Sequence, residues 1–312
     1  MMATAAGLSL PTRVVTGFVD EEVNPLLSLD TNREVALSLV SLGFVSQTPR
    51  EHTGEISSLE LETVPLSRKE VDYPAMREIH AASCLRSAEE VMAWRGKTPK
   101  NKPPSRTGRI VPLEPLTAGD APADPVDRVI LRRGSARRFT QKSIHFSQLS
   151  TLLHRATQGF SSDFLDPAGT LLNELYLIVH SVEGLPSGAY VLHRNDCVLE
   201  CLKEGDFRRE AGHLGLDQEL PADAAVTIFF LADLNPVLKR FGNRGYRAVQ
   251  LEAGILGGKL YLASYAQGLG ATGLTFYDDE VIEFFSPHAK GKSAIFLVAI
   301  GKPPKQAFPQ SP

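Results

Sequence analysis

From residue 126 onward, the spacing of apolar residues changes repeatedly between the 3.6-residue period of a helix and the two-residue period of a strand. Helices are predicted at about 126–132, 147–157, 206–214 and 244–267. Strands are predicted at 174–182, 188–194, 197–203 and 226–233, and again from Ala271. Because hairpins are mixed with helices instead of alternating regularly with them, the pattern indicates an α+β fold.

The longest predicted helix, RGYRAVQLEAGILGGKLYLASYAQ at 244–267, is apolar around most of its circumference. A helix of this kind is normally buried. It also contains Gly254, Gly257 and Gly258, which lack a Cβ atom and let another backbone come close. We therefore expect this helix to lie in the core or in a subunit interface.

One stretch of the chain occurs twice. FVDEEV at 18–23 returns as FYDDEV at 276–281, and the similarity extends without a gap over 18–43 and 276–301, with identical residues at nine of 26 positions. Each copy predicts a short helix opened by acidic residues, which suit a helix N-terminus, followed by a turn and a buried strand ending in glycine. The second copy closes a long folded region, so we expect residues 1–45 to be the end of a first domain.

A less regular region, residues 46–125, connects the first copy to the regular region that begins at residue 126. It contains the stretch SSLELETVPL, read as a short strand, and a helix at about 75–95 in which Ser87 and Glu90 are spaced as a capping box for its second part. The following RGKTPKNKPPSRTGRIVPLEPLTAGDAPADP is rich in proline and glycine. Such a composition is typical of a tether laid along a surface.

Composition narrows the functional classes. With 43% hydrophobic and 22% charged residues, the chain is typical of a globular protein, and its formal net charge of -3 gives no general attraction to nucleic acid or to anionic membranes. No apolar run approaches the roughly 20 residues that span a bilayer, and the N-terminus does not resemble a secretory signal. We therefore expect a cytoplasmic protein. The three cysteines are too few for a disulfide framework or a cysteine-based zinc site, so no metal site is predicted.

Two motifs suggest a phosphate-containing ligand. Gly268 to Gly273 match G-x-G-x-x-G, but a dinucleotide site needs a strand before the motif and a helix after it, and here the predicted order is the reverse. The segment DRVILRRGSARRF at 127–139 contains five arginines, whose guanidinium groups suit phosphate oxygens. Taken alone, this segment is either a phosphate site or a solvated basic face.

Several stretches, in the same order, resemble the nitroreductase-like flavoproteins, and more specifically their SagB-type dehydrogenase branch. They are RRGSARRF, ELYLIVHSVEGLPSGAYVL, FGNRGYRAVQLEAG and LYLASYAQGLGATGLTFYDDEV, and the resemblance covers residues 126–303. It implies a mixed, mostly antiparallel sheet flanked by helices, with FMN bound at the interface of a homodimer. Tandem members of this group carry two such domains, so the resemblance also implies that 1–45 is the remnant of a first one.

The resemblance implies roles for individual residues. Those matching the phosphate, ribityl or pyrimidine positions are Arg133, Ser135 and Arg137. Gly273 and Leu274 match the backbone beside the flavin ring, and Lys302 follows the last strand near the phosphate. The flavin would supply hydride chemistry, with NAD(P)H as a candidate electron donor and a small molecule or peptide as substrate.

Three places depart from the family pattern. Ala168 in DPAGTLL replaces a serine of the flavin pocket, and Ile255 and Gly258-Lys259 replace a histidine and a Gln-Asn pair. Arg240 and Phe241 occupy the Lys-Tyr positions of azoline-oxidising members. Phe241 has no hydroxyl, and Arg240 is too basic to exchange protons near neutral pH.

Two hypotheses follow. The first is an FMN-dependent oxidoreductase acting on a substrate that the sequence does not identify, and the alternative is a non-catalytic member that keeps the fold as a partner or scaffold subunit, for instance in a peptide-modifying complex.

Overall fold

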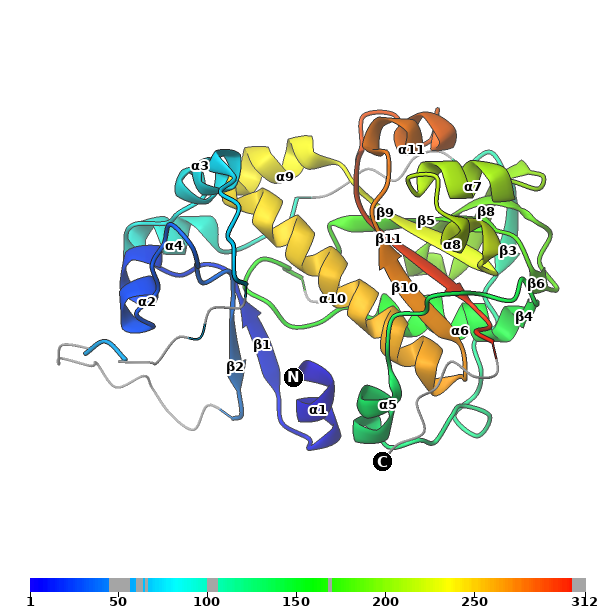
Figure 1. The fold of residues 1–312 in the computed structure, drawn as a ribbon, viewed down its shortest axis with the longest axis horizontal. Helices are drawn as coiled ribbons and strands as arrows, with labels where there is room; N and C mark the ends of the chain where they lie inside the picture. Colours follow the sequence, from blue (N-terminus) through cyan, green and yellow to red (C-terminus); the bar gives the residue numbers. More distant parts are fainter. Residues whose placement is uncertain (45–56, 60–63, 65–66, 100–105, 168–169, 305–312) are drawn as a thin grey trace. The chain divides into compact units, whose positions relative to one another are not determined.

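The computed structural model describes residues 1–44, 57–59, 64, 67–99, 106–167 and 170–304 (Figure 1). Parts of the stretch predicted as a strand, SSLELETVPL, lie outside these residues. The chain forms two compact units. The first comprises residues 1–99, 160–170 and 236–248, and the second comprises 100–159, 171–235 and 249–312.

The first unit contains short helices and one small sheet. Its helices are α1 (Met2–Gly7), α2 (Asp20–Leu26), α3 (Pro74–Ala82), α4 (Ala88–Trp94) and most of α9 (Leu234–Phe241). Strands β1 (Thr12–Val15) and β2 (Leu39–Leu42) pair in antiparallel orientation.

The predicted helix at 75–95 is two helices, α3 and α4, separated by residues 83–87. The second begins where the capping residue predicts, because the Ser87 side chain accepts a hydrogen bond from the Glu90 amide at 3.2 Å. The Glu90 carboxylate, however, accepts from the Arg86 amide at 2.7 Å instead of closing the box on Ser87. A well-capped start at residue 88 is one local reason why the longer helix is divided.

The two copies of the repeated stretch have the same local order of strand, helix and antiparallel strand. In the first copy these are β1, α2 and β2, and in the second they are β10 (Gly270–Leu274), α11 (Asp278–Phe285) and β11 (Ser293–Gly301). Thr12 lies opposite Leu42, whereas Ala271 lies opposite Ile300, the residue aligned with Leu42. The structural similarity therefore extends back into β1, a strand that the sequence pattern did not predict. The first copy has one more residue than the second between this strand and the helix.

The second unit is built on a seven-stranded sheet in the order β10-β11-β9-β5-β7-β8-β3, and all its strand pairs are antiparallel. The remaining strands of this sheet are β3 (Arg109–Pro112), β5 (Asn173–Val179), β7 (Gly188–His193), β8 (Val198–Glu204) and β9 (Val226–Ala232). A short parallel pair, β4 (Ile144–His145) and β6 (Val182–Glu183), accompanies it. The predicted α+β fold with a mixed, mostly antiparallel sheet is confirmed.

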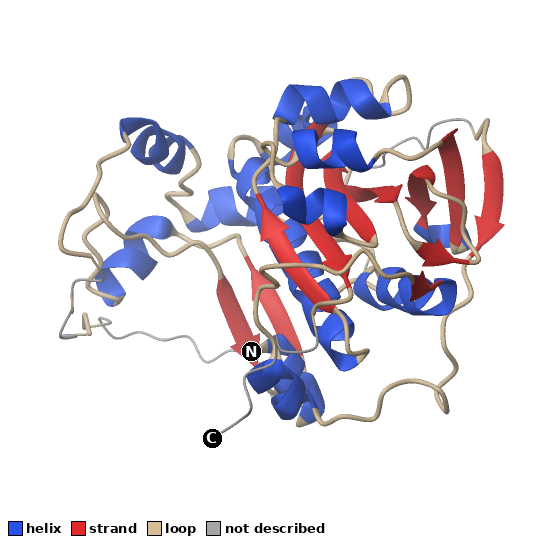
Figure 2. Ribbon diagram, turned by 45° about the vertical axis from the view of Figure 1, so that its right-hand side comes forward, coloured by secondary structure: helices blue, strands red, loops and turns tan. Residues whose placement is uncertain are grey.

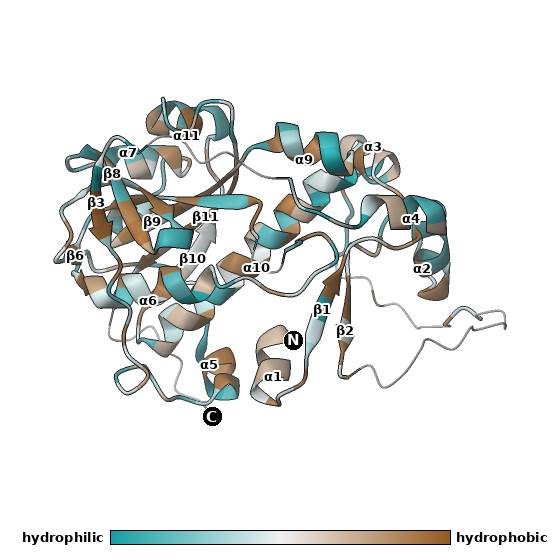
Figure 3. Ribbon diagram, turned by 180° about the vertical axis from the view of Figure 1, so that it is seen from behind, coloured by the Kyte–Doolittle hydropathy of each residue, from teal (hydrophilic) through white to brown (hydrophobic). Residues whose placement is uncertain are grey.

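Helices lie against this sheet (Figure 2). They are α5 (Val126–Arg132), α6 (Phe146–Ala156), α7 (Arg208–Leu214), α8 (Glu219–Asp223), α11 and the greater part of α10 (Arg244–Ala266). Strand β9, which lies between β11 and β5, is buried at every residue and is hydrophobic apart from Thr227 (Figure 3). Phe285 of α11 packs edge-on against Tyr176 and Phe229, with ring centroids 5.1 and 5.7 Å apart, which anchors α11 on the sheet.

The long helix α10 is buried, as predicted, but its three central glycines differ in their surroundings. A Cβ atom at Gly257 would lie 2.5 Å from the ring of Phe296, so only glycine allows the close contact with β11. No described atom lies within 4 Å of a Cβ built at Gly254 or Gly258. Together with Gln250, these two form an exposed stripe on an otherwise buried or half-buried stretch, 249–266.

Among the helices that the structure describes, none is long and apolar enough to cross a membrane.

Candidate functional site

The arginine-rich segment continues from α5 as an extended chain that lies beside the edge strand of the sheet. Ala136 and Phe139 are buried, and the Ala136 amide donates to the Ala271 carbonyl at 2.9 Å. The amide and hydroxyl of Thr140 both donate to the Lys302 carbonyl at 3.0 Å. These backbone contacts fix the segment and leave its alternate side chains, at 133, 135 and 137, exposed.

Three of the predicted cofactor residues lie around a residue that the sequence reasoning had not singled out, Tyr261 of α10. The Gly273 amide donates to the Tyr261 hydroxyl. The Ser135 hydroxyl lies 3.4 Å from the same oxygen, and the Arg133 guanidinium lies over the Tyr261 ring, 5.8 Å from its centroid. Tyr261 had no distinguishing signal in the sequence, because it is one of several large residues on a helix that is apolar on most sides.

This group of residues, Arg133, Ser135, Tyr261 and Gly273, fits a ligand rich in oxygen acceptors. It offers a guanidinium, two hydroxyls and a backbone amide as hydrogen-bond donors. A Cβ atom at Gly273 would lie 2.9 Å from the Phe296 ring and 3.5 Å from the Tyr261 oxygen, so a larger residue would disturb the amide position. We refer to these four residues as the Tyr261 group.

Ion pairing separates the arginines of this segment into two kinds. Arg132 donates to Asp124 at 2.6 Å and to the Tyr265 carbonyl at 3.1 Å. Within the described part of the chain, neither Arg133 nor Arg137 has a carboxylate within 4.0 Å. Exposed guanidinium groups without a carboxylate partner are suited to hold a phosphate.

The other predicted cofactor residues lie in different surroundings. Arg137 lines a hollow of about 260 Å³ together with Gln218 and Asp223. Leu274 is half-buried and packs against the hydrophobic core, so only its backbone remains for a ligand. The Lys302 charge lies close enough to Glu183 to contribute to its lowered pKa, after the larger effects of Ser143 and His145.

The residues at the family's Lys-Tyr positions have packing roles within the first unit. Arg240 donates to the carbonyl of Arg95 at 2.7 Å, at the end of α4. Phe241 is buried, its ring centroid is 5.2 Å from that of Trp94, and its carbonyl accepts from the Trp94 indole at 2.9 Å. Ala168, the first departure in sequence order, lies outside the described residues.

The two arginines of the R-G-Y-R stretch bind the first copy of the repeat. Arg244 is only 2% exposed and pairs with Asp20 at 2.6 Å, while also donating to the Thr16 carbonyl at 2.7 Å. Arg247 lies 3.4 Å from Asp20 and donates to the Ser83 hydroxyl at 2.7 Å. Sequence reasoning assigned no partner to these arginines, because Asp20 lies more than 220 positions away.

Glu252 is a second fully buried charged residue that the sequence did not reveal. Its carboxylate accepts from the Leu172 amide at 2.8 Å and from the Asn173 amide and side chain at 3.2 and 3.0 Å. Burial raises the pKa of Glu252 to about 8. Its hydrogen bonds to Leu172 and Asn173 hold the backbone where the DPAGTLL segment leads into β5.

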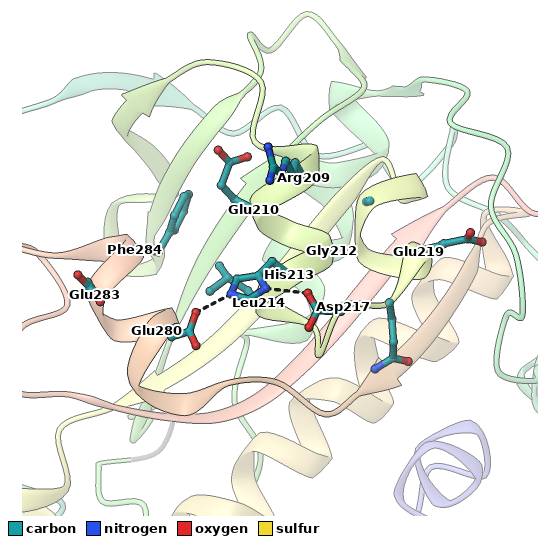
Figure 4. Close-up of a pocket in the computed structure, with 12 residues that line it drawn as sticks. Arg209, Glu210, Gly212, His213, Leu214, Asp217, Glu219, Glu280, Glu283 and Phe284 are labelled. Carbon is teal, nitrogen blue, oxygen red and sulfur yellow. Dashed lines mark hydrogen bonds and ion pairs between the residues drawn. The ribbon is translucent and has the colours of Figure 1, made fainter.

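A larger pocket of about 740 Å³ lies elsewhere on the second unit, between α7, the following turn and α11 (Figure 4). There, His213 pairs with Asp217 and with Glu280, each at 2.7 Å. Hydrogen bonds that the His213 ring donates to the Asp217 and Glu280 carboxylates raise the pKa of His213. None of the predicted cofactor residues lines this pocket.

Comparisons with known proteins agree with the architecture. The model of the nitroreductase family matches residues 130–302. A protein of Methanocaldococcus jannaschii that carries the nitroreductase name is 28% identical over 166 residues, which is 51% of this chain and 82% of that protein.

Two solved structures that carry the same name extend the comparison. One from Anabaena variabilis superimposes with a TM-score of 0.74 and 26% identity, covering 96% of this chain and 62% of its own, so this chain spans less than two thirds of that protein. One from Ralstonia eutropha has a TM-score of 0.50 and 20% identity over 67% of this chain and 98% of its own, which supports the fold alone.

Proposed function

Because the chain belongs to the nitroreductase family, we propose that it is an FMN-dependent oxidoreductase that transfers hydride between the flavin and a substrate. The observation that carries this proposal is the meeting of Arg133, Ser135 and Gly273 around Tyr261, with Ser135 and Gly273 at its hydroxyl and Arg133 over its ring. These residues were expected at a flavin site from sequence alone. Arg133 and Ser135 lie in one segment of the chain and Gly273 lies in another, and both segments meet Tyr261 of α10.

The donor set fits the cofactor. Arg133 and Arg137 would hold the phosphate, while the Ser135 hydroxyl and the Gly273 amide would bind oxygen or nitrogen atoms of the ribityl chain or the ring edge. Tyr261 accepts from Gly273 and so retains its own hydroxyl proton for an acceptor on the ligand. When bound, the flavin supplies the hydride chemistry, and these residues bind and orient it.

The first experiment is the visible spectrum of the purified protein, before and after denaturation, with the released cofactor identified. We expect a yellow protein that releases stoichiometric FMN. The double variant Arg133→Glu, Arg137→Glu should be colourless, because reversed charges repel the phosphate. Arg128→Glu is the matched control, since Arg128 is an exposed arginine of the same segment with no predicted role. Folded wild-type protein that neither retains nor takes up FMN would overturn the proposal.

We also propose a homodimer formed through α10. Gly254 and Gly258 face open space on an exposed stripe, and small residues there would allow a second copy to approach closely. Gly254→Arg should shift the protein from dimer to monomer in sedimentation experiments, because the side chain has room in a single chain but not between two helices. An unchanged dimer would place the contact elsewhere.

The proposal has a more specific form, a SagB-type dehydrogenase activity. Its substrate would be a peptide or a small molecule, and NAD(P)H would be the electron donor. Azoline oxidation is the less supported choice of reaction, because Arg240 and Phe241 are engaged in packing around α4. The same observation favours the second candidate, a non-catalytic scaffold subunit in a peptide-modifying complex. Turnover of NAD(P)H by the flavin-loaded protein separates the two, since a scaffold would show none.

For the domain organisation we propose that 1–45 is the end of a first nitroreductase-like domain, that 46–125 connects it to the next, and that 126–312 is the FMN domain of a cytoplasmic protein. The matching strand, helix and strand of the two copies support this division.

A further inference from the structure

A group formed by the buried Glu200 and the half-buried His193 and His288 in the second unit has no role in the proposed function. His193 ends β7, Glu200 lies on the neighbouring strand β8, and His288 follows α11. One ring nitrogen of each histidine and one carboxylate oxygen of Glu200 lie within 4.8 Å of one another. Their positions, on a hairpin and on a distant loop, form no recognisable motif in the sequence.

Glu200 is completely buried and is held as an anion by its surroundings. Its Oε1 accepts from the amides of Thr107 and Gly108 at 2.7 and 2.8 Å, and its Oε2 lies 2.7 Å from His193 Nε2. Burial raises the pKa of Glu200, but the hydrogen bonds from Gly108, His193 and Thr107 outweigh it and leave the pKa below its usual value. A buried anion of this kind requires a cation or strong donors beside it.

His288 has one ring nitrogen engaged and one without a partner. Its Nδ1 lies 2.8 Å from the Tyr176 hydroxyl, and that hydroxyl lies 3.5 Å from the His288 carbonyl. Its Nε2 is buried and has no hydrogen-bond partner among the residues that the structure describes. In the tautomer where Nδ1–H donates to Tyr176, Nε2 carries a lone pair, and a buried lone pair without a donor is unfavourable unless a ligand binds it.

The ligand types match a transition-metal site. Two imidazoles and one carboxylate bind Zn²⁺ and related divalent ions, and three protein ligands leave a position for water. Metal-binding histidines and carboxylates are usually held from behind by further hydrogen bonds, which Tyr176 and the amides of Thr107 and Gly108 supply. The nearby cation, Lys292, is paired with Glu174 at 2.5 Å, which reduces its repulsion of a bound ion.

We propose that His193, Glu200 and His288 bind one divalent transition-metal ion. Around an ion with ligand bonds of about 2.0–2.2 Å, the 2.7 Å contact between His193 and Glu200 would lengthen as both atoms turn to the ion.

The test uses the full chain, freed of metal by a chelator and titrated with Zn²⁺ by calorimetry and with Co²⁺ by visible absorption. We expect one bound equivalent and a Co²⁺ absorption band that Zn²⁺ abolishes. His288→Ala and Glu200→Gln should each weaken binding by at least about tenfold, and Tyr176→Phe by about 10- to 100-fold. His145→Ala is the matched control, because His145 also pairs with a glutamate but is exposed.

Circular dichroism verifies that each variant is folded. If a variant that lacks a ligand does not fold, the weaker metal binding of Tyr176→Phe tests the proposal in its place. Zn²⁺ should also raise the thermal midpoint of the wild type and of His145→Ala, but not that of His288→Ala. Absence of a bound equivalent, or equal binding by wild type and His288→Ala, would overturn the proposal and leave the group as a buried histidine–glutamate pair. Neither readout depends on flavin, so the result is independent of the proposed oxidoreductase activity.

Discussion

At the scale of single residues, identical side chains have different functions because packing gives them different partners. Arg132 and Arg133 are adjacent, but the first is paired with Asp124 while the second lies over a tyrosine ring. Arg244 is buried against a carboxylate. The sequence shows five arginines close together in one segment and a further arginine pair in another. Only the contacts distinguish a structural arginine from one that is available to a ligand.

His213 provides a test at this scale. Its two carboxylate partners stabilise the protonated ring, so its pKa should lie above the usual value in an NMR titration. Asp217→Asn and Glu280→Gln should each lower it, with the larger effect from Asp217. Glu283→Gln, a change of another carboxylate lining the same pocket, should leave it unchanged. A pKa that is insensitive to both partners would contradict the pairing.

At the scale of elements, small numbers of contacts decide how helices are held. Helix α2 begins at Asp20, which binds Arg244 and Arg247 and also accepts from the Leu85 amide at 2.9 Å. Helix α10 meets β11 where Gly257 lies beside Phe296. Helix periodicity predicted the existence of both helices but not these contacts, because neither partner is close in sequence.

Removing the Asp20 charge should destabilise the first unit strongly. Asp20→Asn leaves Arg244 buried without its counter-ion, which typically costs about 3–5 kcal/mol. Trp94 is the single tryptophan and lies in this unit, so its fluorescence during urea unfolding reports the change. Glu21→Gln is the control: Glu21 is exposed, lies 3.8 Å from Arg86, and should contribute less than about 1 kcal/mol. Equal effects of the two substitutions would show that the buried pair is not important.

The neighbouring glycines of α10 should respond in opposite directions. Gly257→Ala places a methyl group against the Phe296 ring and should destabilise the protein by about 1–3 kcal/mol. In the monomeric Gly254→Arg background, where no second copy packs on α10, Gly258→Ala meets no neighbouring element and should stabilise the helix by up to about 1 kcal/mol, because alanine is the better helix former. Unfolding monitored by far-ultraviolet circular dichroism provides both values. A destabilising Gly258→Ala, with a tolerated Gly257→Ala, would reverse the assignment.

At the scale of the whole molecule, the chain consists of two units, each of which joins segments that are distant in sequence. The first unit includes the first copy of the repeat together with residues 236–248, which carry the R-G-Y-R arginines. The second includes the seven-stranded sheet, the Tyr261 group and the buried histidine–glutamate group. The stretch FGNRGYRAVQLEAG, which resembles the family as one motif, is thus divided between the two units at residues 248 and 249.

Glu252 links the stability of the second unit to pH. Its pKa is about 8 in the folded protein and near 4.5 when exposed, so between these values the folded state holds a proton that the unfolded state releases. The contribution of Glu252 to the free energy of unfolding should therefore be largest below about pH 4.5. It should decrease as the pH rises from there toward 8.

Glu252→Gln should flatten the pH dependence of the unfolding midpoint over that range, because glutamine does not titrate. Glu283→Gln, at an exposed position of α11, should keep the wild-type slope. A slope that persists in Glu252→Gln would assign the pH dependence to other groups.

The sequence by itself determined the α+β class, the longer helices and strands of residues 126–301 without α8, α9, β4 and β6, the repeated stretch, and the resemblance that pointed to Arg133, Ser135 and Gly273. These features follow from periodicity and from local motifs, in which the residues concerned are close in the chain. Only the tertiary structure decided that Tyr261 joins those three residues, that Asp20 neutralises Arg244, and that His193, Glu200 and His288 share one buried space. Such groups depend on contacts across many tens of residues, which side-chain packing sets and local patterns do not record.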